Sequence, residues 1–145
     1  MATVGTHDVP TVAGFVTGGH VSVRAQLGLL RSPEDERRTS ELRLSAWRDT
    51  LVGERLLASD VQPTAEQFTV AMYGYLSRTP AVLIGVSLAD AVGDRRTQNI
   101  PGTSDEYPNW RIPLCDAEGQ AVLIEDLSDC ELVGSVTRAA GSAAG

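Results

Sequence analysis

The chain has 145 residues, of which 42% are hydrophobic and 21% charged, and this is the size and composition of one globular domain. Nineteen acidic residues outnumber 12 basic ones, so the formal net charge is −7, and broad binding to nucleic acid or to an anionic membrane is not expected. Every basic residue is an arginine. The absence of lysine excludes Schiff-base and P-loop chemistry, because both need that amine.

The sequence carries no pattern for export or for membrane insertion. Its longest apolar run, 81–88, is too short to cross a bilayer, and its first residues lack the basic and apolar stretches of a signal peptide. We therefore expect a cytoplasmic protein. Cys115 and Cys130 are the only cysteines, and they have no Cys-x-x-Cys spacing and no neighbouring histidine. They predict two reduced thiols rather than a zinc site or a disulfide framework.

The N-terminal part predicts a short strand followed by helices. Residues 2–6 are expected to form a strand that runs into the polar turn 7–10. One helical stretch is expected to begin at Pro10, and a second covers 20–30. The glycine pair at 18–19 separates the two helices.

Two further helices have clear start sites. Ser32 precedes a proline and two acids, which predicts a capped helix that runs to about residue 57. Thr64 and Gln67 have the spacing of a capping box, and the helix that they begin must stop before Pro80. Its large residues are expected to lie in the core rather than to form a ligand platform: Phe68, Met72, Tyr75 and Leu76.

The remaining chain predicts one strand, a long loop and a weak helix. Residues 81–88 form a continuous apolar run, which is typical of a strand buried on both faces. A helical turn over 89–92 and a long polar loop over 93–113 follow, and a loop of this length in a compact domain is usually functional or disordered. Residues 116–119 predict a turn, and 125–138 predict a weak helix.

These elements do not make a closed structure by themselves. A helix–helix–strand order is typical of parallel sheets that are covered by helices. A strand buried on both faces needs neighbours, but only the N-terminal strand is available to pair with it. We therefore expect the chain to be part of something larger.

His7 and Asp8 directly follow the first predicted strand. Side chains at the carboxyl ends of strands are where α/β folds gather their active sites. The alternative is that Asp8 caps the next helix through its side-chain oxygen. The dipeptide alone does not decide between these two roles.

The second candidate region is the loop 99–114, which concentrates amide, acidic, aromatic and basic side chains. Asn99 offers both a donor and an acceptor to a hydroxyl-rich ligand, and aromatic side chains present flat apolar faces. The alternative is a rigid turn in which Trp110 is anchored to a core and Arg111 pairs with Asp105 or Glu106. For Trp110 and Arg111 we favour this structural interpretation.

Retaining glycoside chemistry needs two carboxyl groups about 5 Å apart, one as the nucleophile and one as the acid/base. Asp8 and Glu106 are the only pair that the chain offers for it. No spacing argument brings these two residues together.

Two of these segments resemble a known family when they are taken in order. ATVGTHDVPTVAGF (2–15) and NIPGTSDEYPNWRIPL (99–114) are similar to the C-terminal part of the bacterial 4-α-glucanotransferases, the amylomaltases of glycoside hydrolase family 77. Residues 76–91, with Arg-Thr-Pro before an apolar strand, resemble the last barrel strand of this family. The resemblance covers nearly the whole chain, although 31–61 is an unspecific helix and the part after Ile124 is weak.

The resemblance implies an enzyme that moves a segment of an α-1,4-glucan to the 4-hydroxyl of another glucan. Asp8 matches the carboxylate that stabilises the transition state, and is therefore the expected catalytic residue. His7 matches the histidine that hydrogen-bonds the same sugar. Asn99 is expected to line the cleft for the donor or the acceptor. No metal and no organic cofactor is implied, since glycosyl transfer needs only carboxylates and hydrogen bonds.

The resemblance also implies a fold class. The chain is expected to be α/β, the C-terminal part of a (β/α)₈ barrel with its last two strands, their helices and the loop after the final strand. The family's nucleophile and acid/base lie on earlier strands, and no segment here matches them. We therefore expect residues 1–140 to be the C-terminal portion of a catalytic barrel, 141–145 to be a flexible tail, and the chain alone to be inactive.

The expected partners are maltooligosaccharides or other α-1,4-glucans and the N-terminal part of the same enzyme. Two alternatives stay open. One is a non-catalytic saccharide-binding or interaction module, and the other is a truncated product that does not fold stably.

Overall fold

The computed structural model describes residues 1–141. Helices dominate the fold, and the described part contains one small parallel sheet. The elements in chain order are β1 (Ala2–Thr3), α1 (Val12–Val16), α2 (Gly19–Gln26), α3 (Pro33–Gly53), α4 (Ala65–Ser77), β2 (Ile84–Gly85), α5 (Leu88–Ala91), a 3-10 helix (Ile124–Asp129) and α6 (Glu131–Gly141). Of the predicted tail, Gly141 is the last residue of α6, and 142–145 lie outside the described residues.

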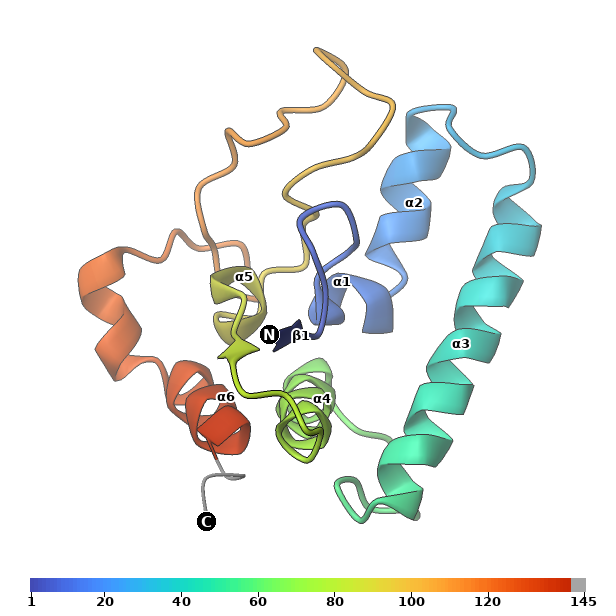
Figure 1. The fold of residues 1–145 in the computed structure, drawn as a ribbon. Helices are drawn as coiled ribbons and strands as arrows, with labels where there is room; N and C mark the ends of the chain where they lie inside the picture. The colour runs from blue at the N-terminus through green and yellow to red at the C-terminus, as the bar shows by residue number, and fades with distance from the viewer. Residues whose placement is uncertain (142–145) are drawn as a thin grey trace.

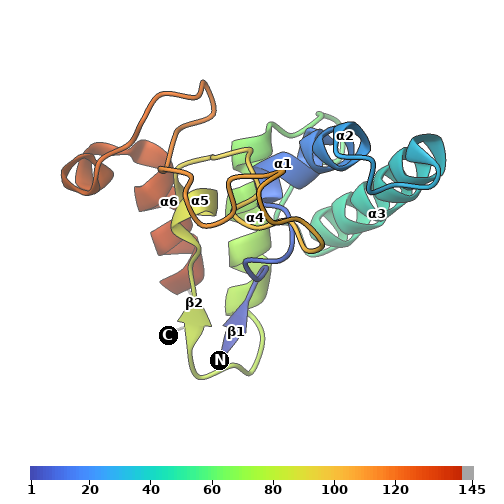
Figure 2. The ribbon, with the colours of Figure 1, turned by 90° about the horizontal axis from the view of Figure 1, so that it is seen from above.

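The two strands are adjacent and parallel, although 80 residues of the chain lie between them. Ala2 pairs with Ile84 and Thr3 with Gly85. A parallel pair needs a crossover connection, and here α1 to α4 supply it. Both strands therefore end at the same edge of the sheet, where β1 continues into the turn with His7 and β2 into α5 (Figure 2).

Helix α4 forms the centre of the helical layer, with α6 on one side and α1 on the other (Figure 1). Phe68, on the side of α4 toward α1, belongs to a core cluster with Val12 and with Leu51 of α3. Tyr73 belongs to a second cluster with Val136 of α6. The long helix α3 runs beside α2 at the edge of the molecule. In the part of the chain that the structure describes, no helix is both long and apolar enough to cross a membrane.

The predicted helix starts are confirmed in atomic detail. The Ser32 side chain accepts a hydrogen bond from Asp35 N, and Thr64 and Gln67 form the reciprocal capping box. Phe68 is buried as predicted, and the predicted turn at 116–119 is present. The predicted end of the third helix is wrong by four residues: α3 stops at Gly53, and Arg55 adopts a left-handed backbone conformation that no helix continues.

The expected strand over 81–88, buried on both faces, is wrong. Only Ile84–Gly85 are paired, and Val82 and Leu83 are 94% and 64% exposed. The reason is that β2 pairs only with β1 among the described residues, so nothing there covers the preceding apolar side chains. The strand expected over 2–6 is likewise limited to two residues, and the helix expected over 125–138 is a 3-10 turn followed by α6.

The buried carboxylate of Asp90 joins three separate parts of the fold. Its Oδ1 accepts a hydrogen bond from Val12 N at 2.7 Å, and its Oδ2 accepts one from the hydroxyl of Tyr73 at 2.9 Å. The same hydroxyl accepts a hydrogen bond from Ser87 N at 3.0 Å. Burial raises the pKa values of both Asp90 and Tyr73, and the negative charge of Asp90 raises that of Tyr73 further. This network fixes the start of α1 against α4 and α5.

A second buried carboxylate closes the base of the long loop. Asp94 is fully buried and accepts hydrogen bonds from the guanidinium of Arg96, at 2.8 Å and 3.0 Å, and from Cys115 N at 3.3 Å. Arg96 also donates to the carbonyl of Pro113. Because these partners stand at the two ends of the segment 97–113, they hold its ends together. We call this set of contacts the loop clamp.

Hydrogen bonds inside the segment 97–113 give it one shape although it has no helix or strand. Asn109 Oδ1 accepts from Ile100 N at 2.8 Å, and Asn109 Nδ2 donates to Thr103 Oγ1 at 2.8 Å. The Tyr107 hydroxyl donates to the carbonyl of Thr97 at 2.6 Å. The loop is therefore rigid enough to present side chains in fixed positions.

Replacing Tyr73 by Phe tests the Asp90 network. The substitution removes a donor to Asp90 and leaves Ser87 N without its acceptor, so we expect the free energy of unfolding to fall by about 2–4 kcal/mol. Urea unfolding followed by circular dichroism measures it. Tyr75→Phe is the matched control, because the Tyr75 ring packs edge-on against Trp47 and the substitution should cost about 0.5 kcal/mol or less. Equal midpoints for the two variants would contradict the role given to Asp90.

Replacing Asp94 by Asn tests the loop clamp. Burial raises the pKa of Asp94, but hydrogen bonds from Arg96 and Cys115 outweigh burial, so the net pKa is lowered. The carboxylate therefore stabilises the fold above its unfolded pKa of about 3.9, and this stabilisation is lost as the pH falls through the lower folded value. We expect Asp94→Asn to cost about 1–3 kcal/mol at pH 7, with a difference from the wild type that shrinks below about pH 4.

Urea unfolding at several pH values measures this difference. Asp105→Asn is the control, because Asp105 is fully exposed at the tip of the same loop. A cost for Asp94→Asn that stays constant between neutral and acidic pH would rule out the ionised clamp.

Candidate functional site

The candidate site lies where the turn after β1 meets the loop after α5. The turn 4–9 stands beside the N-terminus of α1, and the loop 97–113 rises next to it (Figure 1). The parallel pairing of β1 with β2 places both segments at the same edge of the sheet. The two segments that the sequence singled out, some 90 residues apart, are thus neighbours in space.

The structure brings Asp8, His7 and Asn99 together. Asn99 Nδ2 donates a hydrogen bond to Asp8 Oδ1 at 2.6 Å. His7 Nε2 lies 3.4 Å from Asp8 Oδ2. The side chains of His7 and Asp8 are 56% and 48% exposed, so a ligand can reach both. Asp8 therefore keeps one oxygen oriented by an amide while the carboxylate as a whole stays accessible.

The alternative that Asp8 caps the next helix is wrong. The N-cap of α1 is Thr11, whose side chain accepts a hydrogen bond from Gly14 N at 3.0 Å. Val12 N, in the first turn of α1, has no partner within the helix and donates a hydrogen bond to Asp90 Oδ1. Because Thr11 and Asp90 satisfy the start of the helix, Asp8 has no structural duty there.

Within residues 1–141 Trp110 is not anchored to a core, so the structural interpretation of this residue is wrong. Its side chain is 63% exposed and its ring centroid lies 4.8 Å from that of His7, with the planes tilted by 52°. The backbone of Trp110 has a φ of 62°, in the left-handed region that non-glycine residues seldom adopt. The unusual conformation brings an exposed indole against a candidate sugar-binding histidine.

The predicted acidic partners of the loop act within the loop itself. Arg111 Nη2 lies 4.0 Å from Asp105 Oδ1, so one of the two predicted pairs is present, as a wide and exposed contact. Glu106 Oε2 accepts a hydrogen bond from Ser104 N at 2.7 Å, which lowers the pKa of Glu106. The structure thus gives Glu106 a role in the turn and supplies no argument for pairing it with Asp8.

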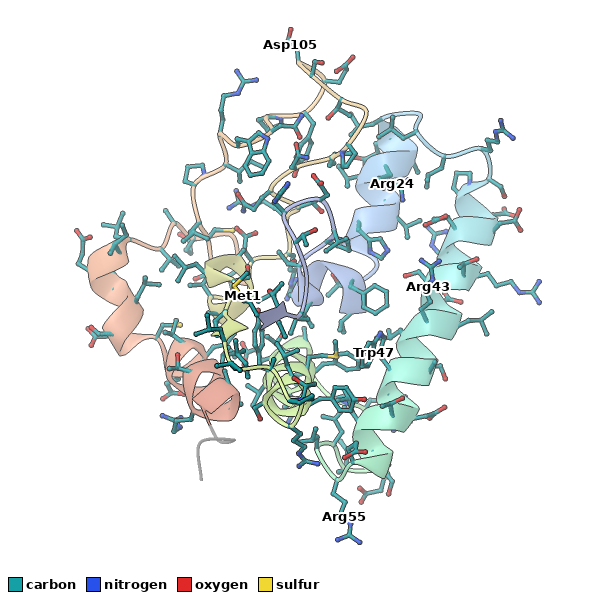
Figure 3. The ribbon with its side chains drawn as sticks, in the orientation of Figure 1. Met1, Arg24, Arg43, Trp47, Arg55 and Asp105 are labelled. Atoms are coloured by element: carbon teal, nitrogen blue, oxygen red, sulfur yellow. The ribbon has the colours of Figure 1, made fainter. Side chains whose placement is uncertain are left out.

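Two hollows border the site. One, of about 390 Å³, runs along the β1–β2 edge and is lined by His7, Trp110, Thr6 and Ser87. The other, of about 710 Å³, lies between α3 and the helices α1 and α4, and touches Asp8 at one end. Figure 3 shows Arg43 and Trp47 on the side of α3 that faces α4. The walls of the second hollow are mainly apolar side chains of helices, and such surfaces are typical of the places where helices pack against each other.

This arrangement suits the binding of a hydroxyl-rich molecule. A carboxylate, an amide and an imidazole offer donors and acceptors in a small area, and an indole offers a flat apolar face beside them. An accessible carboxylate can also stabilise positive charge that develops on a bound ring. Among residues 1–141, no three His, Cys, Asp or Glu side chains are grouped in a way that would hold a metal ion.

Sequence reasoning missed the residues that hold the site in place. Asp90, Asp94 and Arg96 each have at least one partner 17 to 78 residues away in the chain, which local spacing does not indicate. The local spacing of Asp94 and Arg96 could have indicated an ion pair. Nothing in the sequence could have indicated the contact of Trp110 with His7.

Comparisons with known proteins agree on one family. The family model described as 4-alpha-glucanotransferase, glycoside hydrolase family 77, matches residues 1–117. A 4-alpha-glucanotransferase of Mycobacterium tuberculosis is 48% identical over 128 residues, which are 88% of this chain and 18% of the relative. One of Haemophilus influenzae is 30% identical over 119 residues, covering 75% of this chain and 17% of the relative.

A solved structure supports the same assignment. The amylomaltase of Corynebacterium glutamicum superposes with a TM-score of 0.85 at 36% identity, over 95% of this chain and 21% of that one. The described fold is therefore an α/β fold similar to part of an amylomaltase. The chain spans only about a fifth of the length of these relatives. Because the family model matches most of the length of this chain, the chain belongs to glycoside hydrolase family 77, the 4-alpha-glucanotransferases.

Proposed function

We propose that this chain contributes the transition-state-stabilising part of a 4-α-glucanotransferase active site. The single observation that carries the proposal is the contact between Asp8 and Asn99. It joins the two segments on which the family resemblance rests, and it leaves the Asp8 carboxylate accessible. In this proposal the fold is the last part of a (β/α)₈ barrel, of which β1 and β2 are neighbouring strands.

The proposed reaction is a retaining double displacement. A carboxylate nucleophile attacks the anomeric carbon of an α-1,4-linked glucosyl unit, and the 4-oxygen of the leaving glucan takes a proton from a general acid. The 4-hydroxyl of a second glucan then attacks the glycosyl-enzyme and gives its proton to the same group, now acting as the base. We place the nucleophile and the acid/base on parts of the barrel that this chain does not match, since neither the sequence nor the structure gives an argument for pairing Asp8 with Glu106.

The residues of this chain have separate parts in that reaction. Asp8 faces the positive charge that develops on the glucosyl ring, and its charge is most useful at the transition state. Asn99 holds the Asp8 carboxylate in orientation through its 2.6 Å hydrogen bond. His7 binds a hydroxyl of the same sugar unit. The substrates are maltooligosaccharides or longer α-1,4-glucans, and neither a metal nor an organic cofactor takes part.

Replacing Asp8 by Asn tests the proposed role in a complete active site. A chimera is made from the C. glutamicum amylomaltase by replacing its matching segment with residues 1–141 of this chain, since the two have the same fold over this region. We expect Asp8→Asn in this chimera to lower kcat for maltotriose about 10²- to 10³-fold and to change KM little, because the charge acts mainly in the transition state. Asp105→Asn, at the exposed tip of the loop, is the control that should keep full activity. An unchanged kcat for Asp8→Asn would end the assignment.

The chain alone should not catalyse transfer. Incubated with maltotriose, it is expected to yield neither glucose nor longer maltooligosaccharides, because a retaining transfer needs two further carboxyl groups. Chromatography of the oligosaccharides measures this. The appearance of both shorter and longer products would show that the chain contains its own nucleophile, and would refute this part of the proposal.

A further inference from the structure

Trp110 is held in a backbone conformation that its own side chain does not favour. Its φ of 62° lies in the left-handed region, and among the described residues Arg55 is the only other non-glycine residue with a positive φ. Trp110 N donates a hydrogen bond to the carbonyl of Gln98 at 3.1 Å, and the preceding Asn109 is fixed by Ile100 and Thr103. The loop clamp and these bonds keep the strained residue in place. Such strain persists mainly where the position of a side chain matters for function.

Burial among the described residues does not explain why an aromatic side chain stands at this position. The indole is 63% exposed, so packing leaves most of its apolar surface in water. The ring contact that the structure gives it is with His7, at 4.8 Å between centroids. The imidazole is thereby limited in its movement beside Asp8, while much of the indole remains open. A large open aromatic surface next to polar groups is typical of a binding site.

The open indole borders a hollow whose walls are mainly apolar and carry a few polar groups. Trp110 and His7 line the hollow of about 390 Å³ together with Thr6 and Ser87, which add hydroxyl groups. This volume falls within the range of about 300–1,000 Å³ that small-molecule sites occupy. A pyranose ring has one face rich in C–H groups, and these are attracted to the negative face of an aromatic ring. Its hydroxyls lie around the rim, where donors and acceptors can reach them.

We propose that Trp110 is the stacking residue of a glucosyl-binding subsite and that it also positions His7 for the same sugar. The inference rests on the proposed function and deepens it, because it assigns the ligand of this hollow as one glucosyl unit of an α-1,4-glucan. The indole stacks against the C–H face of the glucosyl ring, and His7 and the neighbouring hydroxyl groups form hydrogen bonds with the hydroxyls at the edge of that ring. Trp110 thus contributes to affinity, whereas Asp8 contributes to the chemical step.

Binding of maltotriose to the chain tests this proposal directly. The sequence has only two tryptophans, so Trp47→Phe leaves Trp110 as the sole indole and Trp110→Phe leaves Trp47. We expect maltotriose to change the fluorescence of the Trp47→Phe variant saturably and that of the Trp110→Phe variant little. By calorimetry, Trp110→Ala should weaken binding about tenfold or more, and Trp110→Phe less, since a phenyl ring keeps part of the stacking surface. Trp47→Phe should keep the wild-type Kd, because Trp47 packs against Tyr75 away from this hollow.

The outcomes separate this inference from the proposed function. If the wild type binds maltotriose and Trp110→Ala binds it equally well, the stacking role is overturned while the glucan function stands. If the wild-type chain shows no binding of maltotriose by calorimetry, this inference is overturned, whereas the proposed function is judged separately by the kcat of the Asp8→Asn chimera. A thermal melt of each variant checks that it is folded. If Trp110→Ala is unfolded, the proposal is tested with the other two variants. It is overturned if Trp110→Phe binds maltotriose as tightly as the wild type and the Trp110 fluorescence of Trp47→Phe does not respond to maltotriose.

Discussion

The buried carboxylate of Asp90 is the contact on which the geometry of the site depends. It binds Val12 N at the first turn of α1 and the hydroxyl of Tyr73 in α4, and Tyr73 in turn binds Ser87 N before α5. A buried charge is costly unless hydrogen bonds satisfy it, so these partners cannot move independently. Because α1 follows directly after the turn with His7 and Asp8, the network sets where that turn stands relative to the second strand and the long loop.

A second buried carboxylate sets the other half of the site. Asp94 and Arg96 hold together the two ends of the segment 97–113, and the hydrogen bonds of Asn109 and Tyr107 fix its interior. Asp90 and Asp94 are only four residues apart. The two halves of the site are thus held by two neighbouring carboxylates, and each one satisfies backbone donors that no helix or strand would satisfy.

The site itself is open, and this agrees with the two roles that we propose for its residues. Asp8 and His7 are about half exposed, and Trp110 is more exposed still. The rigid parts lie below the site, and the ligand-facing side chains lie on loops above them, which is a common division in α/β enzymes. The strained backbone of Trp110 can persist because the loop around it is held at both ends.

The sequence by itself determined two helix starts and the identity of the candidate residues. The capping oxygens of Ser32 and Thr64 predicted two helix starts correctly, since a cap depends on neighbours three residues away. The family resemblance named Asp8, His7 and Asn99. Only the tertiary structure decided that Asp8 contacts Asn99 rather than capping a helix. It also decided that the Trp110 ring contacts the His7 ring and that the apolar residues before β2 are exposed. These are contacts between segments far apart in the chain, and they follow from how helices and strands pack, which no local pattern of residues encodes.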